Sequence, residues 1–252
     1  MEIKFLGNWA SHIQAGKRNV SIIIDGHILL DCGPHTIESM LESGINPAQV
    51  DEILISHMHL DHYGGLAEIL WYRAAREAKD EVIILGPKGI MQNTEQLLKI
   101  YNTPDHYMFS MKSNYVEINN NGEIYEVKTK FTDKVKNDYI EAFTGNHSIP
   151  DNMYRLEYHG NTIAYTGDTA YNDNIAQVGE KADIFFHEMT FTDEDAEIAK
   201  LSKHSTYSSA LRGFSESHAK KLVPVHLTDK TVSTLKAKSS ENIILPFTDM
   251  NL

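Results

Sequence analysis

The sequence predicts a mixed α/β (α+β) fold in which two β-sheets pack face to face and helices cover their outer sides. Three observations support this prediction. Short apolar runs typical of buried strands recur through both halves of the 252 residues, helix-like segments separate them, and no Gly/Ser-rich or Pro-rich linker divides the halves. We therefore expect a single domain over residues 1–252, which is long enough to bury a large core.

The first part of the chain alternates strand-like and helix-like segments. The pair Asp25-Gly26 lies between two β-branched or aliphatic runs and predicts a hairpin. Pro34 favours the start of a helix, and Gly44 favours its end. The expected strands are 22–24, 28–30, 53–55 and 82–85, and the expected helices are 34–44, 66–79 and 88–100.

Residues 102–122 contain Pro104, several aromatic side chains and several Asn without a clear period. We expect an irregular loop there, with or without a short hairpin, which either lies near the mouth of a site or is a plain connector. The remaining chain resumes the earlier alternation. Strands are expected at 123–131, 139–145, 153–159, 162–166, 183–187 and 222–225, and a helix at 206–220.

Composition excludes several classes of protein. The net charge of −12 opposes tight nonspecific binding to nucleic acid, so we expect no DNA partner. No apolar run approaches the roughly 18–20 residues of a membrane helix, so no membrane partner is expected. The N-terminus does not resemble a signal peptide. The one cysteine, Cys32, allows neither an internal disulfide nor a cysteine metal cluster, and we expect a cytoplasmic protein.

The segment 55–65 carries the strongest chemical signal in the sequence. It contains three histidines and one aspartate within six residues, directly after an apolar strand. An extended backbone points His57 and His59 to the same side, whereas Asp61 and His62 follow the start of a turn. Imidazole and carboxylate ligands together suit Zn, Mn or Fe. The alternative, a coincidental polar loop, does not explain this spacing.

This pattern resembles the His-x-His-x-Asp-His signature of the metallo-β-lactamase superfamily. Four further segments resemble that family's other motifs and follow in the family's order. They are Leu29-Leu30-Asp31-Cys32-Gly33, Gly145-Asn146-His147-Ser148, Tyr165-Thr166-Gly167-Asp168-Thr169 and Val223-Pro224-Val225-His226. The resemblance implies a four-layer αββα sandwich with metals at the loop edge between its sheets.

The resemblance also implies two divalent metal ions, with zinc favoured and Mn or Fe left open. One ion would be held by His57, His59 and His147. The second would be held by Asp61, His62 and His226, and Asp168 would bridge both. Asp31 would orient the ligand loop or cap a turn, Cys32 would be buried, and no role is specified for His35.

Other segments resemble one branch of the superfamily, ribonuclease Z. These are Phe5-Leu6-Gly7, Lys17-Arg18-Asn19-Val20-Ser21, His187-Glu188-Met189-Thr190-Phe191 and His204-Ser205-Thr206. By this resemblance His204 is a general acid for the leaving oxygen, Glu188 supports it, and Asp61 serves the attacking water. Histidine suits that role because its ordinary pKa lies near the working pH. A solvated loop histidine is the alternative for His204.

Two departures from ribonuclease Z bear on the substrate. The run Gly7-Asn8-Trp9-Ala10 replaces the usual Gly-Thr-Ser, and only about twenty residues separate His147 from Asp168, where long-form enzymes carry a tRNA-binding arm. We therefore expect a dinuclear metal-dependent phosphodiesterase acting on a small phosphodiester, a cyclic nucleotide or an RNA end. The alternatives are hydrolysis of lactams or thioesters, as in lactamases and glyoxalases, and a non-catalytic binding protein. The resemblance to this superfamily also implies that the chain forms a homodimer.

Overall fold

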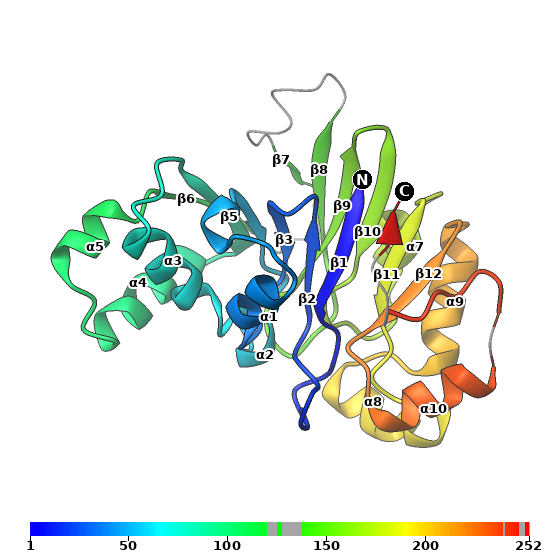
Figure 1. Cartoon of the computed structure of the whole chain (residues 1–252). Helices are drawn as coiled ribbons and strands as arrows, with labels where there is room; N and C mark the ends of the chain where they lie inside the picture. Colours follow the sequence, from blue (N-terminus) through cyan, green and yellow to red (C-terminus); the bar gives the residue numbers. More distant parts are fainter. Residues whose placement is uncertain (120–124, 128–137, 239, 247–249, 252) are drawn as a thin grey trace.

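Two β-sheets form the centre of the structure, which is a computed structural model (Figure 1). It describes residues 1–119, 125–127, 138–238, 240–246 and 250–251. Within that part of the chain, the seven-stranded sheet has the order β13-β1-β2-β3-β4-β5-β6 and the six-stranded sheet the order β12-β11-β10-β9-β8-β7.

The first sheet consists of β1 (Glu2–Gly7), β2 (Ser21–Ile24), β3 (Ile28–Leu30), β4 (Glu52–Leu54), β5 (Val82–Pro87), β6 (Ser113–Ile118) and β13 (Met250–Asn251). Strands β3 to β6 run parallel, whereas β1 pairs antiparallel with β13 and β2, and β2 with β3. The turn at Asp25-Gly26 joins β2 to β3 as the sequence predicts, with Ile24 opposite Ile28.

The second sheet consists of β7 (Tyr125–Val127), β8 (Tyr139–Thr144), β9 (Asn152–Tyr158), β10 (Asn161–Tyr165), β11 (Ile184–Glu188) and β12 (Leu222–Val225). Strands β7 to β10 are antiparallel, and β10, β11 and β12 are parallel. The inner faces of the two sheets meet in one buried apolar core, which includes Ile22, Leu54, Leu156 and Phe186. Burial of these side chains is the main force that holds the sheets together.

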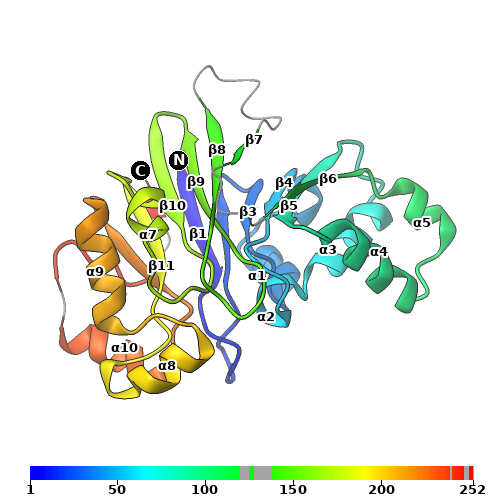
Figure 2. The same cartoon turned by 180° about the vertical axis from the view of Figure 1, so that it is seen from behind.

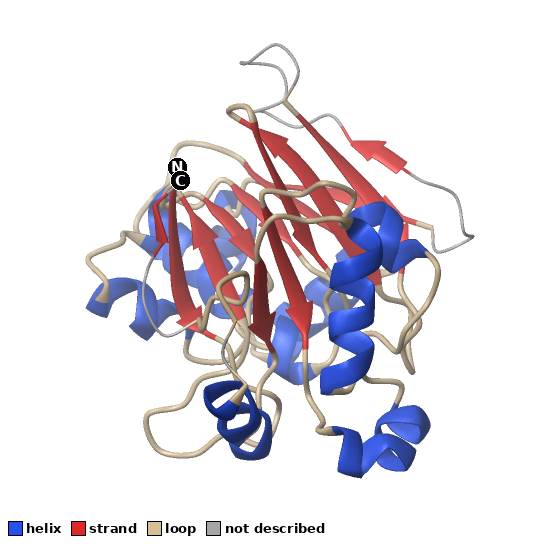
Figure 3. Ribbon diagram, turned by 90° about the vertical axis from the view of Figure 1, so that its right-hand side faces the viewer, coloured by secondary structure: helices blue, strands red, loops and turns tan. Residues whose placement is uncertain are grey.

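Helices cover both outer faces, so the chain has the expected four-layer αββα architecture (Figures 1 and 2). Helices α1 (Thr36–Glu42), α3 (Leu66–Ala75), α4 (Ile90–Ile100) and α5 (Asp105–Ser110) lie beside the first sheet. Helices α7 (Asn174–Val178), α9 (Tyr207–Ser217) and α10 (Asp229–Ala237) lie beside the second, and Figure 3 shows the layers from the side. The short helices α2 (Leu60–Tyr63) and α8 (Ala196–Ser202) lie at one edge of the sandwich.

The prediction for residues 102–122 is wrong in part. Residues 105–110 form α5, and residues 113–118 form β6, which pairs parallel with β5 rather than in a hairpin. The periodicity of β6 is weak because it is the edge strand of its sheet and only Ile118 is buried. Of the strand expected at 123–131, only 125–127 are described, and they form β7; the rest of that segment lies outside the described residues.

Within the described segments, no helix is long and apolar enough to cross a membrane.

Candidate metal centre

The predicted site residues converge at one edge of the sandwich, where α2 and α8 lie. Each motif except that of His204, which follows α8, comes after or ends a strand of one of the two sheets. Asp31 follows β3, His57 follows β4, His147 follows β8, Asp168 follows β10, Glu188 ends β11 and His226 follows β12. Because these strand ends lie at the same edge, residues far apart in the sequence come within a few ångströms of one another.

Glycines allow the loop that carries the ligand histidines to pack tightly. A Cβ at Gly33 would lie 2.5 Å from the Asp61 carbonyl oxygen, and a Cβ at Gly65 would lie 2.4 Å from the Gly33 carbonyl oxygen. A side chain at either position would therefore push the loop after β3 away from the loop that carries Asp61 and His62.

His57, His59 and His147 form the first group of converging side chains. His59 Nδ1 lies 2.9 Å from His57 Nε2 and 3.2 Å from His147 Nε2. The three candidate ligand atoms lie within 4.8 Å of one another. Burial lowers the pKa of each of these imidazoles, which favours the neutral form that binds a cation.

Asp61, His62 and His226 form a second group of three, and their candidate ligand atoms also lie within 4.8 Å of one another. Asp61 Oδ2 lies 3.3 Å from His226 Nε2 and 3.8 Å from His62 Nε2. The carboxylate of Asp168 lies between the two groups. Its Oδ2 is 3.3 Å from both His62 Nε2 and His226 Nε2 and 3.8 Å from His57 Nε2. The structure thus brings together all seven residues that the sequence predicts as ligands, with Asp168 between the two groups.

Unpartnered buried atoms show that this donor set fits cations. His62 Nε2 and Asp168 Oδ1 are buried, and neither forms a hydrogen bond with any residue that the structure describes. Burial raises the pKa of the Asp168 carboxyl, but the charges of His226 and His62 outweigh it and hold that pKa well below its usual range. A buried carboxylate that stays ionised among imidazole nitrogens, with one oxygen left without a partner, matches a divalent cation site of O and N ligands.

Asp31 holds the ligand loop in place. Its Oδ1 accepts a hydrogen bond from the Ser56 N–H at 2.7 Å, and its Oδ2 accepts from the Ser56 hydroxyl at 2.7 Å. His62 Nδ1 is 2.6 Å from the same Oδ2, and the Tyr165 hydroxyl donates to it. Asp31 therefore fixes the ring of His62 so that Nε2 faces Asp168, which is the orienting role expected of it rather than turn capping alone.

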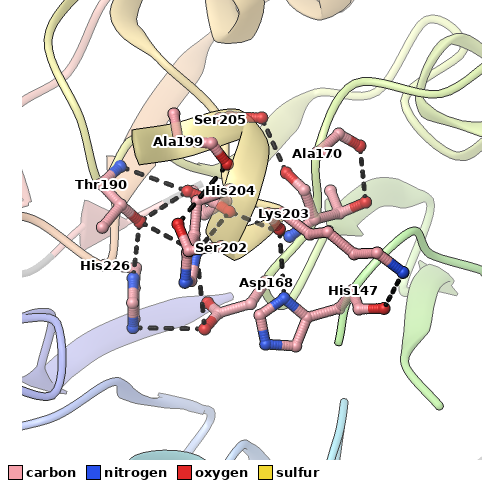
Figure 4. Close-up of polar contacts among 12 residues, drawn as sticks. His147, Asp168, Ala170, Thr190, Ala199, Ser202, Lys203, His204, Ser205 and His226 are labelled. Atoms are coloured by element: carbon pink, nitrogen blue, oxygen red, sulfur yellow. Dashed lines mark hydrogen bonds and ion pairs between the residues drawn. The ribbon is translucent and has the colours of Figure 1, made fainter. Parts of the chain in front are cut away.

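Two other ligand histidines are oriented by their second ring nitrogen (Figure 4). His226 Nδ1 lies 2.7 Å from Thr190 Oγ1, whose own proton is donated to Glu188 Oε2 at 2.6 Å. His147 Nδ1 donates to the Lys203 carbonyl oxygen at 3.1 Å, and Lys203 Nζ donates to the His147 carbonyl oxygen at 2.9 Å. Both arrangements leave Nε2 directed at the cluster.

His204 and Glu188 form a pair beside the cluster. His204 Nδ1 is 2.9 Å from Glu188 Oε1, while His204 Nδ1 is also 3.9 Å from Asp168 Oδ2. Burial lowers the pKa of His204, but the charge and hydrogen bond of Glu188 outweigh it and raise that pKa to about 9. His204 is half-buried at the cluster rather than solvated on a loop, so the geometry fits a proton donor.

Sequence reasoning missed Asp151, which lies under the first group. Its carboxylate is buried and Oδ1 lies 3.5 Å from His57 Nδ1. Two glycines make room for it: a Cβ at Gly145 would lie 2.0 Å from Asp151 Oδ2, and a Cβ at Gly167 would lie 2.8 Å from Oδ1. The only sequence signal is that Asp151 follows His147 by four residues between two predicted strands.

The chain is similar in sequence and in fold to proteins that are already known. Ribonuclease Z from Bacillus subtilis (strain 168) is 26% identical over an alignment of 273 positions, which spans 90% of this chain and 88% of that protein. The crystal structure of the short form of human tRNase Z (ELAC1) superimposes with a TM-score of 0.82 at 22% identity and covers 100% of this chain and 99% of the other. A diphosphatase of the PhnP family has a TM-score of 0.73 at 15% identity, covering 100% and 97%.

The chain has the metallo-β-lactamase fold and is a metal-dependent hydrolase similar to ribonuclease Z. A family model narrows the assignment further. The model for the anti-Pycsar protein Apyc1 matches residues 1–245, and the chain belongs to that family. Sequence motifs alone reach the ribonuclease Z branch but do not single out this family.

Proposed function

We propose that this chain is a two-metal phosphodiesterase that cleaves small phosphodiesters. One observation carries the proposal: two groups of three ligand atoms meet at Asp168, and the His204–Glu188 pair lies directly beside them. We assign one ion to His57, His59 and His147 and the other to Asp61, His62 and His226, with zinc favoured over Mn or Fe. When bound, two such cations lower the pKa of a water and neutralise charge on the phosphoryl group.

The chain's own residues supply positioning and proton transfer. Protonated His204 donates from Nε2 to the leaving oxygen, while its Nδ1–H stays bound to Glu188. Glu188 is itself fixed, because its Oε1 accepts from the Thr169 N–H at 2.9 Å and its Oε2 from the Thr190 N–H at 3.2 Å. Asp61, at the edge of the second group, orients the attacking water.

A small substrate fits the structure better than folded tRNA. The segment between His147 and Asp168 is described throughout, and it consists of β9, β10 and their connections, with no room for a tRNA-binding arm. The net charge of −12 also opposes binding of a long polyanion. The relatives named ribonuclease Z support phosphodiester chemistry, so a cyclic nucleotide or a short RNA end is the substrate class we infer.

A substrate panel tests this proposal. Protein loaded with Zn or Mn is assayed on bis(p-nitrophenyl) phosphate, cyclic nucleotides, precursor tRNA, a lactam and a thioester. We expect both the chromogenic diester and a cyclic nucleotide to be cleaved, with precursor tRNA no better than either at physiological salt. Asp168→Asn should abolish activity, whereas His106→Ala, which changes an exposed histidine on α5, should not. Hydrolysis of the lactam or thioester alone would refute the proposal.

We also infer a cytoplasmic homodimer that folds as a single domain and binds no DNA. Cys32, the one cysteine of the chain, is buried as a free thiol, which suits a reducing compartment. The side chains of Ile100, Tyr101 and Phe109 are 73%, 54% and 88% exposed on and beside α4 and α5, an apolar surface that a second copy would cover. Light scattering should give twice the chain mass, and Phe109→Glu should shift it toward the monomer.

A further inference from the structure

A cavity of about 350 Å³ lies beside the metal centre and is not used by the chemistry proposed above. Its aromatic and aliphatic walls come from Trp9, Phe191 and Ile198, and its polar lining includes His12 and Gln14. Trp9 belongs to the run in which this sequence departs from ribonuclease Z. We refer to this cavity as the Trp9 pocket.

The Trp9 pocket shares a wall with the metal centre. Thr190 lines the pocket, and its hydroxyl is 2.7 Å from His226 Nδ1 and 3.4 Å from His204 Nδ1. The ring of Phe191 lies 5.8 Å from the ring of His204, centroid to centroid. Thr190 and Phe191 thus link the pocket to His204 and His226 through direct contacts.

The backbone fixes Trp9 to the same loop that carries a ligand. The Ala10 N–H donates to the Leu227 carbonyl oxygen at 3.0 Å, and the Leu227 N–H donates to the Asn8 carbonyl oxygen at 2.9 Å. Leu227 directly follows His226. The indole is also held by the Lys17 ammonium, which lies 4.0 Å from its ring centroid. The aromatic wall is thus positioned relative to the metal centre before any ligand binds.

The charges in the pocket cancel, which indicates a neutral ligand. Lys17 pairs with Asp229, and Lys230 Nζ lies 3.0 Å from Asp195 Oδ2. Neither cation is free to neutralise a second phosphate. The remaining polar groups are uncharged amide and hydroxyl groups and a histidine, which can bond the edge of a flat heterocycle whose face packs on aromatic side chains.

We propose that the Trp9 pocket binds the purine or pyrimidine base of the phosphodiester substrate and thereby sets substrate preference. This inference rests on the proposed function, because it places the phosphate at the metal centre. In this proposal Trp9 and Phe191 bind the base, which takes no part in the reaction.

Kinetics on paired substrates test the proposal in the metal-loaded enzyme. One substrate is a nucleoside 3′,5′-cyclic phosphate and the other is the same cyclic phosphate without its base. Trp9→Leu keeps an apolar side chain but removes the ring. It should lower kcat/KM for the nucleotide by about fivefold to a hundredfold, the usual effect of one lost base–aromatic stack, and leave the abasic substrate unchanged. Trp9→Phe should restore most of the loss.

Trp71→Leu is the matched control, because Trp71 is the other tryptophan and lies on α3 against Tyr107, in a pocket whose lining includes no candidate ligand. It should change neither substrate. Equal losses on both substrates in Trp9→Leu would show that Trp9 only supports the loop that carries His226. An unchanged kcat/KM for the nucleotide would show that the base does not contact Trp9. Either result would overturn the proposal.

A binding measurement separates this proposal from the proposed function. In Trp71→Phe, Trp9 is the remaining tryptophan, and its emission reports on the pocket directly. A nucleoside 5′-monophosphate should quench it, whereas ribose 5-phosphate should not. If no phosphodiester is hydrolysed but this difference is seen, the proposed function fails and the pocket stands. If the diester is hydrolysed and both compounds leave the emission unchanged, the pocket assignment fails alone.

Discussion

Replacement of His204 distinguishes proton donation from metal binding. His204 lies 2.9 Å from Glu188 and 3.9 Å from Asp168, close enough to assist the reaction but bonded through Nδ1 to a residue outside the predicted ligand set. The charge and hydrogen bond of Glu188 raise the pKa of this imidazole, which favours its protonated form. Removal of a positioned acid costs about 10²–10⁴-fold in rate. This loss of rate corresponds to an increase of about 2.7–5.4 kcal/mol in the activation free energy.

The loss should depend on the leaving group. An alkoxide such as a ribose oxygen needs a proton as it departs, whereas p-nitrophenolate does not. His204→Ala should therefore slow cyclic nucleotide hydrolysis by about 10²–10⁴-fold and bis(p-nitrophenyl) phosphate hydrolysis far less.

Glu188→Gln should show the same pattern in weaker form, because it only orients and supports the imidazole. Metal content, measured by elemental analysis, should equal that of the unchanged protein and of the His106→Ala control. Equal losses on both substrates, or loss of a metal, would refute the role given to His204.

Three further changes test the metal centre and the fold. His59→Ala should lower the metal content from about two to about one ion per chain and abolish hydrolysis; two retained ions in elemental analysis would remove His59 from the ligand set. Asp31→Ala should weaken metal affinity by about 10–100-fold, because His62 loses the partner at 2.6 Å that fixes its ring, and competition with a chelator measures this. The hydrogen bond to Asp51 outweighs burial and raises the pKa of His27 in the folded chain, so its stabilisation is present below the unfolded value of about 6.5 and is lost as pH rises through the folded pKa. The difference in Tm between the unchanged protein and His27→Gln should therefore be larger at pH 6 than at pH 9, and a constant difference would contradict this.

Most of the residues that sequence reasoning found share one property: they follow or end a strand that apolar patterning reveals. His57 follows the run Ile53-Leu54-Ile55, and His226 follows a short strand that ends at Val225. Local pattern therefore marked both the strand and the polar residue at its end. The grouping of the expected ligands around two positions came from the resemblance to the metallo-β-lactamase superfamily, not from the local pattern.

The residues that sequence reasoning missed act through contacts remote in sequence. The Tyr165 hydroxyl reaches Asp31 across 134 positions, and Asp151 meets the His57 ring from the other sheet. Such contacts depend on how the two sheets pack, which no local pattern encodes. The same reason explains why the sequence did not predict β6. Its strand conformation depends on pairing with β5, because its own residues show no clear alternation.

Each predicted ion draws its ligands from both sheets. His57 and His59 belong to the loop after β4 in the first sheet, and His147 follows β8 in the second; Asp61 and His62 likewise face His226. The cations would therefore act as cross-links between the two halves of the sandwich as well as reagents. Free energy of metal binding then becomes free energy of folding, so a strong chelator would loosen the packing between the sheets as it stops hydrolysis.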